Sequence, residues 1–190
     1  MFMTEEKREH LSKIITVPYE VLATMAICKP RRAGGNQYRH MAQTLNILID
    51  YGHIDSILHK AALVHDLIED LPNFDRILIN NADEDGPEVL KLVLEVTRRR
   101  GEPKAEFLDR IYREGSEQAC LIKAADRIAN LIDIGLMTDT NFISRYCNES
   151  ESYVLPISDR VDKDMSTEIR DLIMSRRKLL FALEHQYWGN

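Results

Sequence analysis

The sequence lacks the long apolar runs and the paired cysteines that mark membrane-spanning and disulfide-linked secreted proteins. Its 190 residues include three cysteines, Cys28, Cys120 and Cys147, with no Cys-x-x-Cys spacing. Their odd number and apolar helical surroundings indicate reduced, buried thiols. The apolar runs are too short to cross a bilayer, and residues 1–10 alternate acidic and basic side chains instead of forming a leader peptide. We therefore expect a cytoplasmic protein with no membrane segment.

The chain also lacks the excess of basic residues that general nucleic-acid binding requires. It has 25 Lys and Arg against 31 Asp and Glu, a formal net charge of -6. This balance argues against a nucleic-acid partner but allows a local basic pocket for a phosphorylated small molecule. The length suits one domain with a sizeable core. We expect residues 1–190 to form a single domain, with its core over about 18–160.

Periodic apolar residues predict helix after helix in the N-terminal third of the chain. Thr4 is a suitable N-cap for a first helix, and a second helix is expected to begin near Pro18. His40 is expected to open a third helix that closes at Gly52, where glycine can take a left-handed conformation.

The remaining chain is also predicted to be helical. A central helix over 54–70 carries apolar residues on nearly all sides and ends before Pro72. The acidic stretch 80–87 is interpreted as an exposed loop with solvated charges. Ser116 caps a further buried helix, and a packing helix is expected over about 165–187, its exposed flank being a candidate homo-oligomer contact. The fold class predicted is an all-α bundle.

The central helix carries the strongest chemical motif of the chain, His65-Asp66-Leu67-Ile68-Glu69-Asp70. In a helix, residues four apart lie one turn above each other, so these ionisable groups share one sector. Burying carboxylates is costly unless a cation takes them as ligands. A bare His-Asp pair is more often an ordinary surface feature, but the second acidic pair and the apolar surroundings favour a metal site.

A polar stripe on the helix after Ser116 suggests where further ligands lie. Its members fall at i, i+3, i+7 and i+10, namely Lys123, Asp126, Asn130 and Asp133. The alternative is a solvated stripe on a half-exposed helix. If the stripe is buried, the simplest partner of Asp126 is the cation that also binds His65 and Asp66. Adding His40 gives a site with two histidines and two aspartates.

Two basic segments are candidates for binding phosphate. Residues 29–38 form a glycine-containing loop with cationic side chains and an aromatic, able to bring amides and guanidinium groups to an anion. Alone, this loop is equally well a solvated linker, but it leads directly into His40. The basic turn 97–101 either reaches phosphate or lies on the surface.

These motifs, in this order along an all-helical chain, resemble the HD superfamily of metal-dependent phosphohydrolases. The finer similarity is to the hydrolase domain of the RelA/SpoT group and to the small alarmone hydrolases, which remove the 3′-pyrophosphate from (p)ppGpp using manganese. The resemblance rests on Arg31-Arg32, His65-Asp66-Leu67-Ile68-Glu69-Asp70, Leu92-Val93-Leu94-Glu95-Val96-Thr97-Arg98 and Leu121-Ile122-Lys123-Ala124-Ala125-Asp126-Arg127-Ile128-Ala129-Asn130.

The resemblance implies a role for each matching residue. The implied ligands of Mn²⁺, or of another divalent transition metal, are His40, His65, Asp66 and Asp126. Glu69 and Asp70 are implied to position and activate the attacking water. The implied substrate contacts are Arg31 and Arg32 to the base and phosphates, Asn130 to the sugar, and Lys123 to a departing phosphate. As an alternative, Lys123 and Arg127 form only structural ion pairs.

The chain departs from the family pattern at two places. It reads Tyr38-Arg39-His40-Met41 where the family usually has Tyr, two residues and then His-Pro. Asp133 stands where the family tends to have a small hydroxyl residue, and an added carboxylate there repels phosphate or binds a different base or sugar. Three functions therefore stay open: an alarmone pyrophosphohydrolase, an HD phosphohydrolase or nucleotidase for another nucleotide, and a non-catalytic, antitoxin-like nucleotide-binding module. Glu69 and Asp70 favour the two enzymes.

Overall fold

Helices make up the regular structure of the described chain. The structure, a computed structural model, describes residues 3–186, so Tyr187 of the predicted last helix lies outside the described residues. Within 3–186 no strand occurs, and an isolated bridge joins Pro30 to Asn36. The predicted all-α bundle is confirmed.

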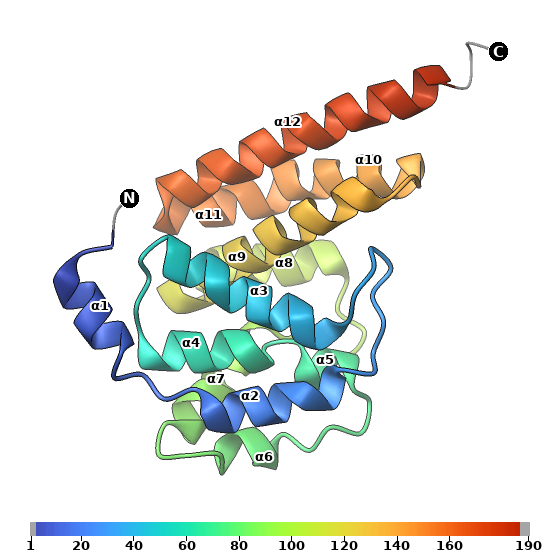
Figure 1. Cartoon of the computed structure of the whole chain (residues 1–190). Helices are drawn as coiled ribbons and strands as arrows, with labels where there is room; N and C mark the ends of the chain where they lie inside the picture. The colour runs from blue at the N-terminus through green and yellow to red at the C-terminus, as the bar shows by residue number, and fades with distance from the viewer. Residues whose placement is uncertain (1–2, 187–190) are drawn as a thin grey trace.

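The helical elements follow one another with short connections (Figure 1). The first half of the chain contains α1 (Glu5–Leu11), α2 (Val17–Ala23), η1 (Thr24–Ala26), α3 (Gln37–Asp50), α4 (Ser56–Val64), α5 (Leu67–Asp70) and α6 (Ile77–Asn80). The second half contains α7 (Gly86–Val96), α8 (Lys104–Glu114), α9 (Glu117–Asp133), η2 (Ile134–Leu136), α10 (Thr140–Glu149), the π-helical turn η3 (Ser150–Val154), α11 (Leu155–Val161) and α12 (Lys163–Gln186).

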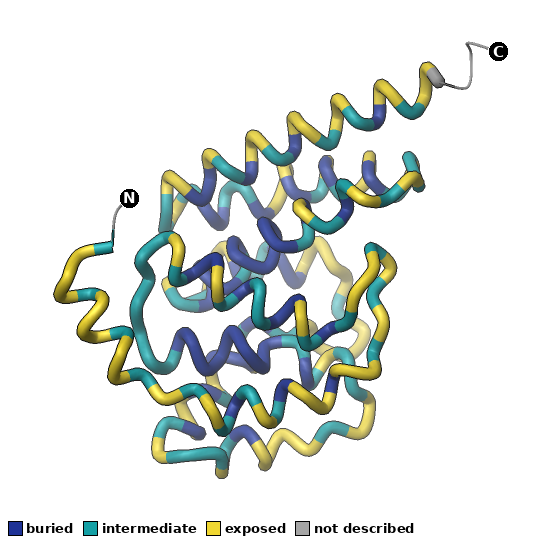
Figure 2. The backbone as a smooth tube through the Cα atoms, viewed as in Figure 1, coloured by how far each residue is buried: buried dark blue, intermediate teal, exposed yellow. Residues whose placement is uncertain are grey.

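Two buried helices, α4 and α9, form the centre of the molecule. Helix α3 packs against both, α9 also packs against α11 and α12, and α4 packs against α2 and α7. Figure 2 shows the buried residues concentrated on α4, α9 and the inner faces of their neighbours. The small residues Ala61, Ala62, Ala124 and Ala125 are fully buried, which lets the helices approach closely. The predicted central position of the segment before His65 is therefore correct.

Side-chain caps fix where several helices begin. The side chains of Thr4 and Ser116 accept hydrogen bonds from the backbone amides of Lys7 and Ala119, as predicted. Asn36 caps α3 in the same way, so this helix begins at Gln37. His40 lies within the first turn and does not open the helix. Gly52, with φ +73°, follows the C-terminus of α3, as its left-handed preference predicts.

The prediction of one continuous helix over 54–70 is wrong, because the helix is interrupted at His65 and Asp66. Helix α4 ends at Val64 and α5 begins at Leu67, with His65 and Asp66 in the turn between them. The cause is local: His65 Nδ1 donates to the carbonyl of Ala62 at 2.8 Å. That carbonyl is the one that the amide of Asp66 would bind in a continuous helix.

The break also changes the burial of the acidic groups. The side chains of Asp66 and Asp70 are 24% and 28% exposed, whereas that of Asp126 is 9% exposed. The expectation of three buried carboxylates on one helix is therefore wrong. One deeply buried carboxylate comes from α9, and the carboxylates of the His-Asp motif lie at the edge of a cavity.

The acidic stretch 80–87 is structural and not merely solvated. Lys60 on α4 has a side chain 6% exposed, and its Nζ lies 2.7 Å from Asp83 and 2.6 Å from Asp85. Burial alone would lower the pKa of Lys60, but the bonds to Asp83 and Asp85 outweigh this effect, so the pKa is raised. Tyr19 on α2 donates to Asp83 at 2.6 Å. Removing both carboxylates would leave the buried Lys60 charge without a partner, so the loop holds α2 and α4 together.

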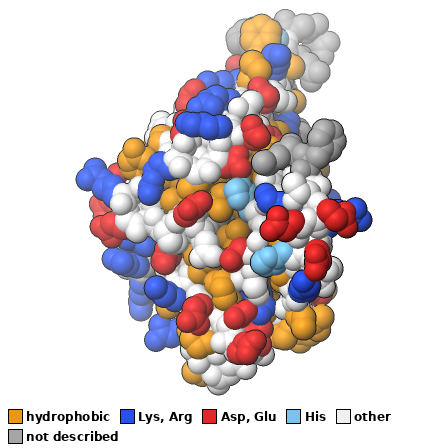
Figure 3. All heavy atoms as spheres, turned by 90° about the vertical axis from the view of Figure 1, so that its left-hand side faces the viewer, with side chains coloured by type: hydrophobic (Ala, Val, Ile, Leu, Met, Phe, Trp, Pro, Cys, Tyr) orange, Lys and Arg blue, Asp and Glu red, His pale blue; other side chains and the backbone are white. Residues whose placement is uncertain are grey.

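The surface and the cysteines test further predictions from the sequence. Among residues 3–186, no helix is long and apolar enough to span a membrane. Figure 3, which looks onto the side of α1, shows acidic and basic side chains intermixed, with no continuous basic band on this face. The three cysteines are free, as predicted; Cys120 and Cys147 are buried, but Cys28 is exposed, so the expectation of burial is wrong for Cys28.

Candidate active site

A polar cavity of about 310 Å³ opens beside α3, α5 and α9. It is lined by Arg31, Gln37, His40, Asp66, Glu69, Asp70, Arg98, Lys104, Phe107, Lys123, Asp126, Arg127, Asn130 and Tyr146. Helix α9 contributes the polar stripe predicted from the sequence, because Lys123, Asp126 and Asn130 all face this space. The alternative of a solvated stripe is excluded for these three residues.

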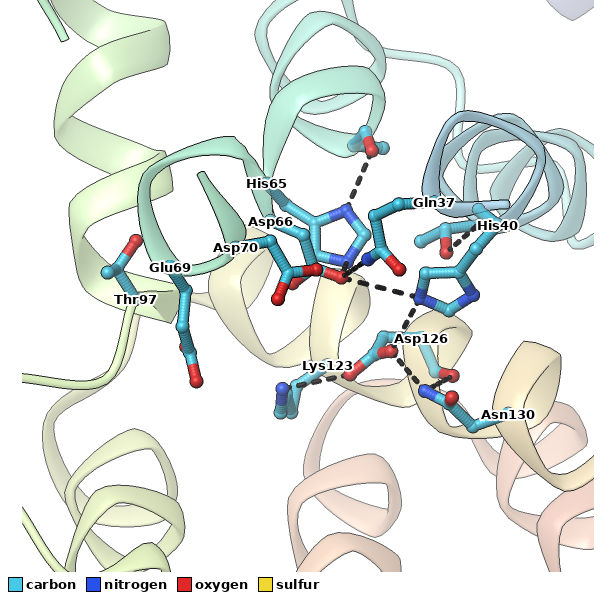
Figure 4. A network of polar contacts seen from close by, with 12 residues as sticks. Gln37, His40, His65, Asp66, Glu69, Asp70, Thr97, Lys123, Asp126 and Asn130 are labelled. Carbon is cyan, nitrogen blue, oxygen red and sulfur yellow. Dashed lines mark hydrogen bonds and ion pairs between the residues drawn. The ribbon is translucent and has the colours of Figure 1, made fainter. Parts of the chain in front are cut away.

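The inner end of the cavity gathers the side chains predicted to bind a metal (Figure 4). His40, His65 and Asp126 each offer a ligand atom, and these atoms lie within 4.8 Å of one another. Asp66 Oδ2 lies 3.2 Å from His65 Nε2 and 3.6 Å from His40 Nε2. The structure therefore brings the four residues together from α3, the turn before α5, and α9.

The hydrogen bonds of the two histidines fit a bound cation. A carbonyl oxygen only accepts, so His65 Nδ1 carries the proton that Ala62 receives at 2.8 Å. In the neutral imidazole, Nε2 then holds a lone pair facing the carboxylates, and this buried atom has no hydrogen-bond partner. His40 Nε2 lies 3.1 Å from Asp126 Oδ1, and its Nδ1 is buried without a partner. Imidazole nitrogens beside carboxylates suit divalent transition metals.

The charges of this group favour a bound cation. Burial lowers the pKa of His65, but the carboxylates of Asp66 and Asp126 raise it to about 9. Burial raises the pKa of Asp126, but Lys123, whose Nζ lies 2.8 Å away, and the two histidines hold it well below its usual range. A positive charge placed between these residues is therefore stabilised by two carboxylates.

Glu69 and Asp70 lie nearer the opening of the cavity. Asp70 is beside Asp66 in Figure 4, and its Oδ1 lies 2.7 Å from Lys29 Nζ. Glu69 lies farther from the histidines; its Oε2 accepts from the backbone amide of Arg98 at 3.2 Å, and its Oε1 lies 3.4 Å from the Arg98 guanidinium. Both acids line the cavity without joining the His40, His65 and Asp126 group.

The predicted substrate contacts divide into two sets. Arg31, Lys123 and Asn130 line the cavity, but Arg32 does not. Arg32 turns toward α10, where it pairs with Asp139 and its guanidinium lies 4.5 Å from the centre of the Phe142 ring. The loop carrying both arginines is a tight turn in which the amide of Arg31 bonds to Gly35, and the two side chains leave it in different directions.

Asp133 holds Arg31 in place. The Arg31 guanidinium lies 2.5 Å from Asp133 Oδ2 and also donates to Asn130 Oδ1 at 2.5 Å. The side chains of Arg31 and Asp133 are 13% and 17% exposed. The carboxylate that departs from the family pattern is therefore neutralised by a cavity residue and does not face the cavity as a free negative charge.

Several cavity residues were missed by sequence reasoning. The carboxamide of Gln37 donates to Asp66. Lys104, Phe107 and Tyr146 come from α8 and α10, for which the sequence offered no motif. Arg98 belongs to the basic turn 97–101, for which the sequence predicts either a phosphate contact or a surface position, and it lines the cavity.

Arg127 matches the structural alternative given for it. It is almost fully buried and lies 2.7 Å from Glu149 and 4.2 Å from the Tyr146 ring centre. Lys104 also pairs with Glu149, at 2.9 Å. These contacts join α8, α9 and α10 into one wall of the cavity.

Comparisons with known proteins define the class of fold. No protein-family model matches the chain. The helical arrangement is similar to that of a solved structure, which has a TM-score of 0.69 to the chain at 21% identity. The alignment covers 93% of this chain and 98% of that one. The solved structure is of a metazoan ortholog of SpoT that hydrolyzes ppGpp and plays a role in starvation responses.

Sequence comparison points in the same direction. The chain is 29% identical over 157 residues to the GTP pyrophosphokinase rsh of Brucella ovis and to that of Brucella abortus. Each match covers 75% of this chain but 20% of the relative, so the chain spans about a fifth of the length of the curated relatives it matches. The resemblance to the RelA/SpoT-type hydrolase domain is confirmed.

Proposed function

We propose that this chain is a metal-dependent pyrophosphohydrolase that removes the 3′-pyrophosphate of ppGpp-type alarmone nucleotides. The observation that carries the proposal is a buried group of His40, His65 and Asp126 at the end of a cavity whose walls supply cations. Those cations are Arg31, Arg98, Lys104 and Lys123. Support also comes from the similar structure of an ortholog of SpoT that hydrolyzes ppGpp.

The proposed metal ligands are His40, His65, Asp66 and Asp126. Their mixed nitrogen and oxygen donors suit Mn²⁺ or a similar divalent ion. Such an ion supplies Lewis acidity toward phosphate oxygens and makes a nearby water more acidic. The hydrogen bond from His65 to Ala62 orients that ring and fixes its tautomer, which is the usual role of an outer contact to a ligating histidine.

The acids at the cavity opening are proposed to handle the proton of the attacking water. Water attacks the phosphorus bonded to the 3′ oxygen, its proton passes to Glu69 or Asp70, and the bond between that phosphorus and the 3′ oxygen breaks. The 3′ oxygen leaves as a hydroxyl after gaining the proton that Glu69 or Asp70 took from the water, and the other water proton stays on the released pyrophosphate. A positioned carboxylate typically contributes about 10² to 10⁴-fold to such a step.

The basic walls of the cavity are proposed to hold the rest of the nucleotide. Lys123, Lys104 and Arg98 suit the pyrophosphate, since charge-assisted hydrogen bonds to phosphate are stronger than neutral ones. Arg31 offers a planar guanidinium for stacking on the base, and Asn130 lies beside it for the sugar. Arg32 faces Asp139 instead, so its predicted contact with phosphate is not part of this proposal.

Further predictions concern the domain organisation, location and partners of the protein. We expect one domain over 1–190, a cytoplasmic location, a small-molecule nucleotide as the substrate and no nucleic-acid partner. The flank of α12 stays a candidate homo-oligomer contact, because Met174 and Phe181 are 52% and 64% exposed there.

A substrate panel tests the proposed specificity. The purified chain with Mn²⁺ is offered ppGpp, pppGpp, ppApp and ordinary nucleotides, and we expect the guanosine alarmones to be hydrolysed fastest. Asp133→Thr, which releases Arg31, is the informative variant, and we expect it to raise KM for ppGpp. If Asp133→Thr instead improves ppGpp hydrolysis, or if the wild-type protein prefers an ordinary nucleotide, the alarmone assignment gives way to an HD phosphohydrolase for another nucleotide.

A further inference from the structure

We propose that Arg110, on α8 and outside the cavity, is a positioning residue for Glu69. It holds the turn formed by residues 97–102, and that turn fixes the Glu69 carboxylate through Arg98. The inference rests on the proposed function, in which Glu69 handles a proton of the attacking water. Nothing in the sequence motifs points to Arg110, which lies beyond the segment Leu92–Arg98.

Arg110 binds both ends of the 97–102 turn. Its guanidinium donates to the backbone carbonyls of Glu95 at 3.1 Å and Thr97 at 3.2 Å. It also makes a two-pronged contact with the Glu102 carboxylate, at 2.8 Å and 3.0 Å. The side chains of Arg110 and Glu102 are 14% and 11% exposed. A planar guanidinium with several fixed bonds restrains its partners more than a single contact does.

Glu102 closes the turn from the other side. Its carboxylate also accepts from the backbone amide of Arg99 at 2.9 Å, while its own amide donates to the Arg99 carbonyl at 3.0 Å. The bond from Arg110 and the amide of Arg99 hold the pKa of Glu102 at about 2, against the opposing effect of burial. Gly101 adopts φ +79°, a conformation that lets the chain reverse here.

The turn delivers two donors to Glu69. The amide of Arg98 binds Oε2 at 3.2 Å and its guanidinium lies 3.4 Å from Oε1. Within residues 3–186, these are the hydrogen bonds and ion pairs that Glu69 makes. Figure 4 shows Thr97, the residue before Arg98, on the side of Glu69 that faces away from the histidines. Because Glu69 sits on the four-residue helix α5 and its side chain is 35% exposed, its orientation depends on this turn.

Arg110→Met tests the proposal, since it keeps an apolar stem and removes every bond to the turn. We expect kcat to fall about 10-fold, because small displacements of a reacting group cost up to about 10² in rate. The Mn²⁺ content should stay unchanged. Arg113→Met is the matched control: Arg113 lies one turn farther along α8 and pairs with Asp109 on the surface, so its loss should leave kcat unchanged. Arg110→Lys should be intermediate.

A double-mutant cycle separates positioning from a merely structural role. If Arg110 acts through Glu69, then Arg110→Met should change the residual rate of Glu69→Gln by less than about 2-fold, because coupled residues are non-additive. An equal 10-fold loss in both backgrounds would overturn the proposal, as would an unchanged kcat for Arg110→Met.

Hydrogen exchange keeps the inference testable apart from the enzyme assay. We expect Arg110→Met to speed exchange of the Arg98 amide by about 10-fold or more, since local opening exposes that hydrogen bond. Arg113→Met should leave the exchange rate unchanged. An Arg98 amide that is equally protected in both variants rejects the positioning role. If Arg110→Met speeds exchange of the Arg98 amide as expected but the wild-type protein shows no turnover, the proposed function is rejected and the contact between the turn and Glu69 is not.

Discussion

Asp126→Asn is expected to remove the bound cation and to lower turnover by at least about 100-fold. Loss of a residue that only contacts a ligand typically lowers metal affinity or activity 10- to 100-fold, and we propose Asp126 as one of the ligands themselves. The substitution keeps the shape of the side chain, so packing of α9 is preserved. It removes the negative charge that faces His40 at 3.1 Å and Lys123 at 2.8 Å.

The loss of metal should also be visible in thermal unfolding. A ligand at about 100 times its dissociation constant stabilises the folded state by about 2.7 kcal/mol. For a chain of this size, that corresponds to a rise of about 5–10 °C in melting temperature. We expect Mn²⁺ to give this rise in the wild-type protein and little or none in Asp126→Asn.

Asp171→Asn is the control for this experiment, because Asp171 is exposed on α12. It should leave metal content, turnover and the Mn²⁺-dependent melting shift unchanged. Elemental analysis of the purified proteins measures the metal bound per chain, which decides the assignment. If Asp126→Asn retains one equivalent of metal and full turnover, the assignment of Asp126 as a ligand is wrong.

Glu69→Gln is expected to keep the metal and lose most turnover. A general base that handles a proton of water contributes about 10² to 10⁴-fold, and glutamine cannot accept that proton. The carboxamide can still accept from the Arg98 amide, so the side chain keeps its place. Mn²⁺ content and the melting temperature should therefore match those of the wild-type protein.

The matched control is Glu88→Gln, on the exposed surface of α7, for which we expect wild-type kinetics. Measuring kcat and metal content on the same samples separates the two roles open to Glu69. A Glu69→Gln protein without metal would make Glu69 a ligand. A metal-loaded variant with an unchanged kcat would leave proton transfer to another group, with Asp70 the nearest acid in sequence.

Sequence reasoning succeeded where the signal is local. The N-caps at Thr4 and Ser116 follow from hydroxyl side chains that satisfy free amides of a first turn. The stripe from Lys123 to Asn130 follows from helical spacing on a buried helix. The cost of burying carboxylates without a cation predicts that Asp126 joins His65 and Asp66, and the structure brings these residues together with His40.

Sequence reasoning failed where a tertiary contact decides the outcome. A local side-chain bond has the same effect: the bond from His65 to Ala62 lies at the point where the expected helix is interrupted, and periodicity carries no sign of it. Arg31 and Arg32 are adjacent and chemically equal, so only the path of their loop separates a cavity residue from one that faces Asp139. Lys104 and Tyr146 reach the cavity through packing of α8 and α10, which no motif marks.

We propose that this chain cleaves the 3′-pyrophosphate from ppGpp with water, and product analysis in ¹⁸O-labelled water tests this activity most directly. The purified Mn²⁺-loaded protein is incubated with ppGpp, and the products are separated and weighed by mass spectrometry. We predict GDP and pyrophosphate in equal amounts, with one ¹⁸O in the pyrophosphate. Release of single phosphates, or intact ppGpp with a metal-loaded protein that is active on another nucleotide, would contradict the claim.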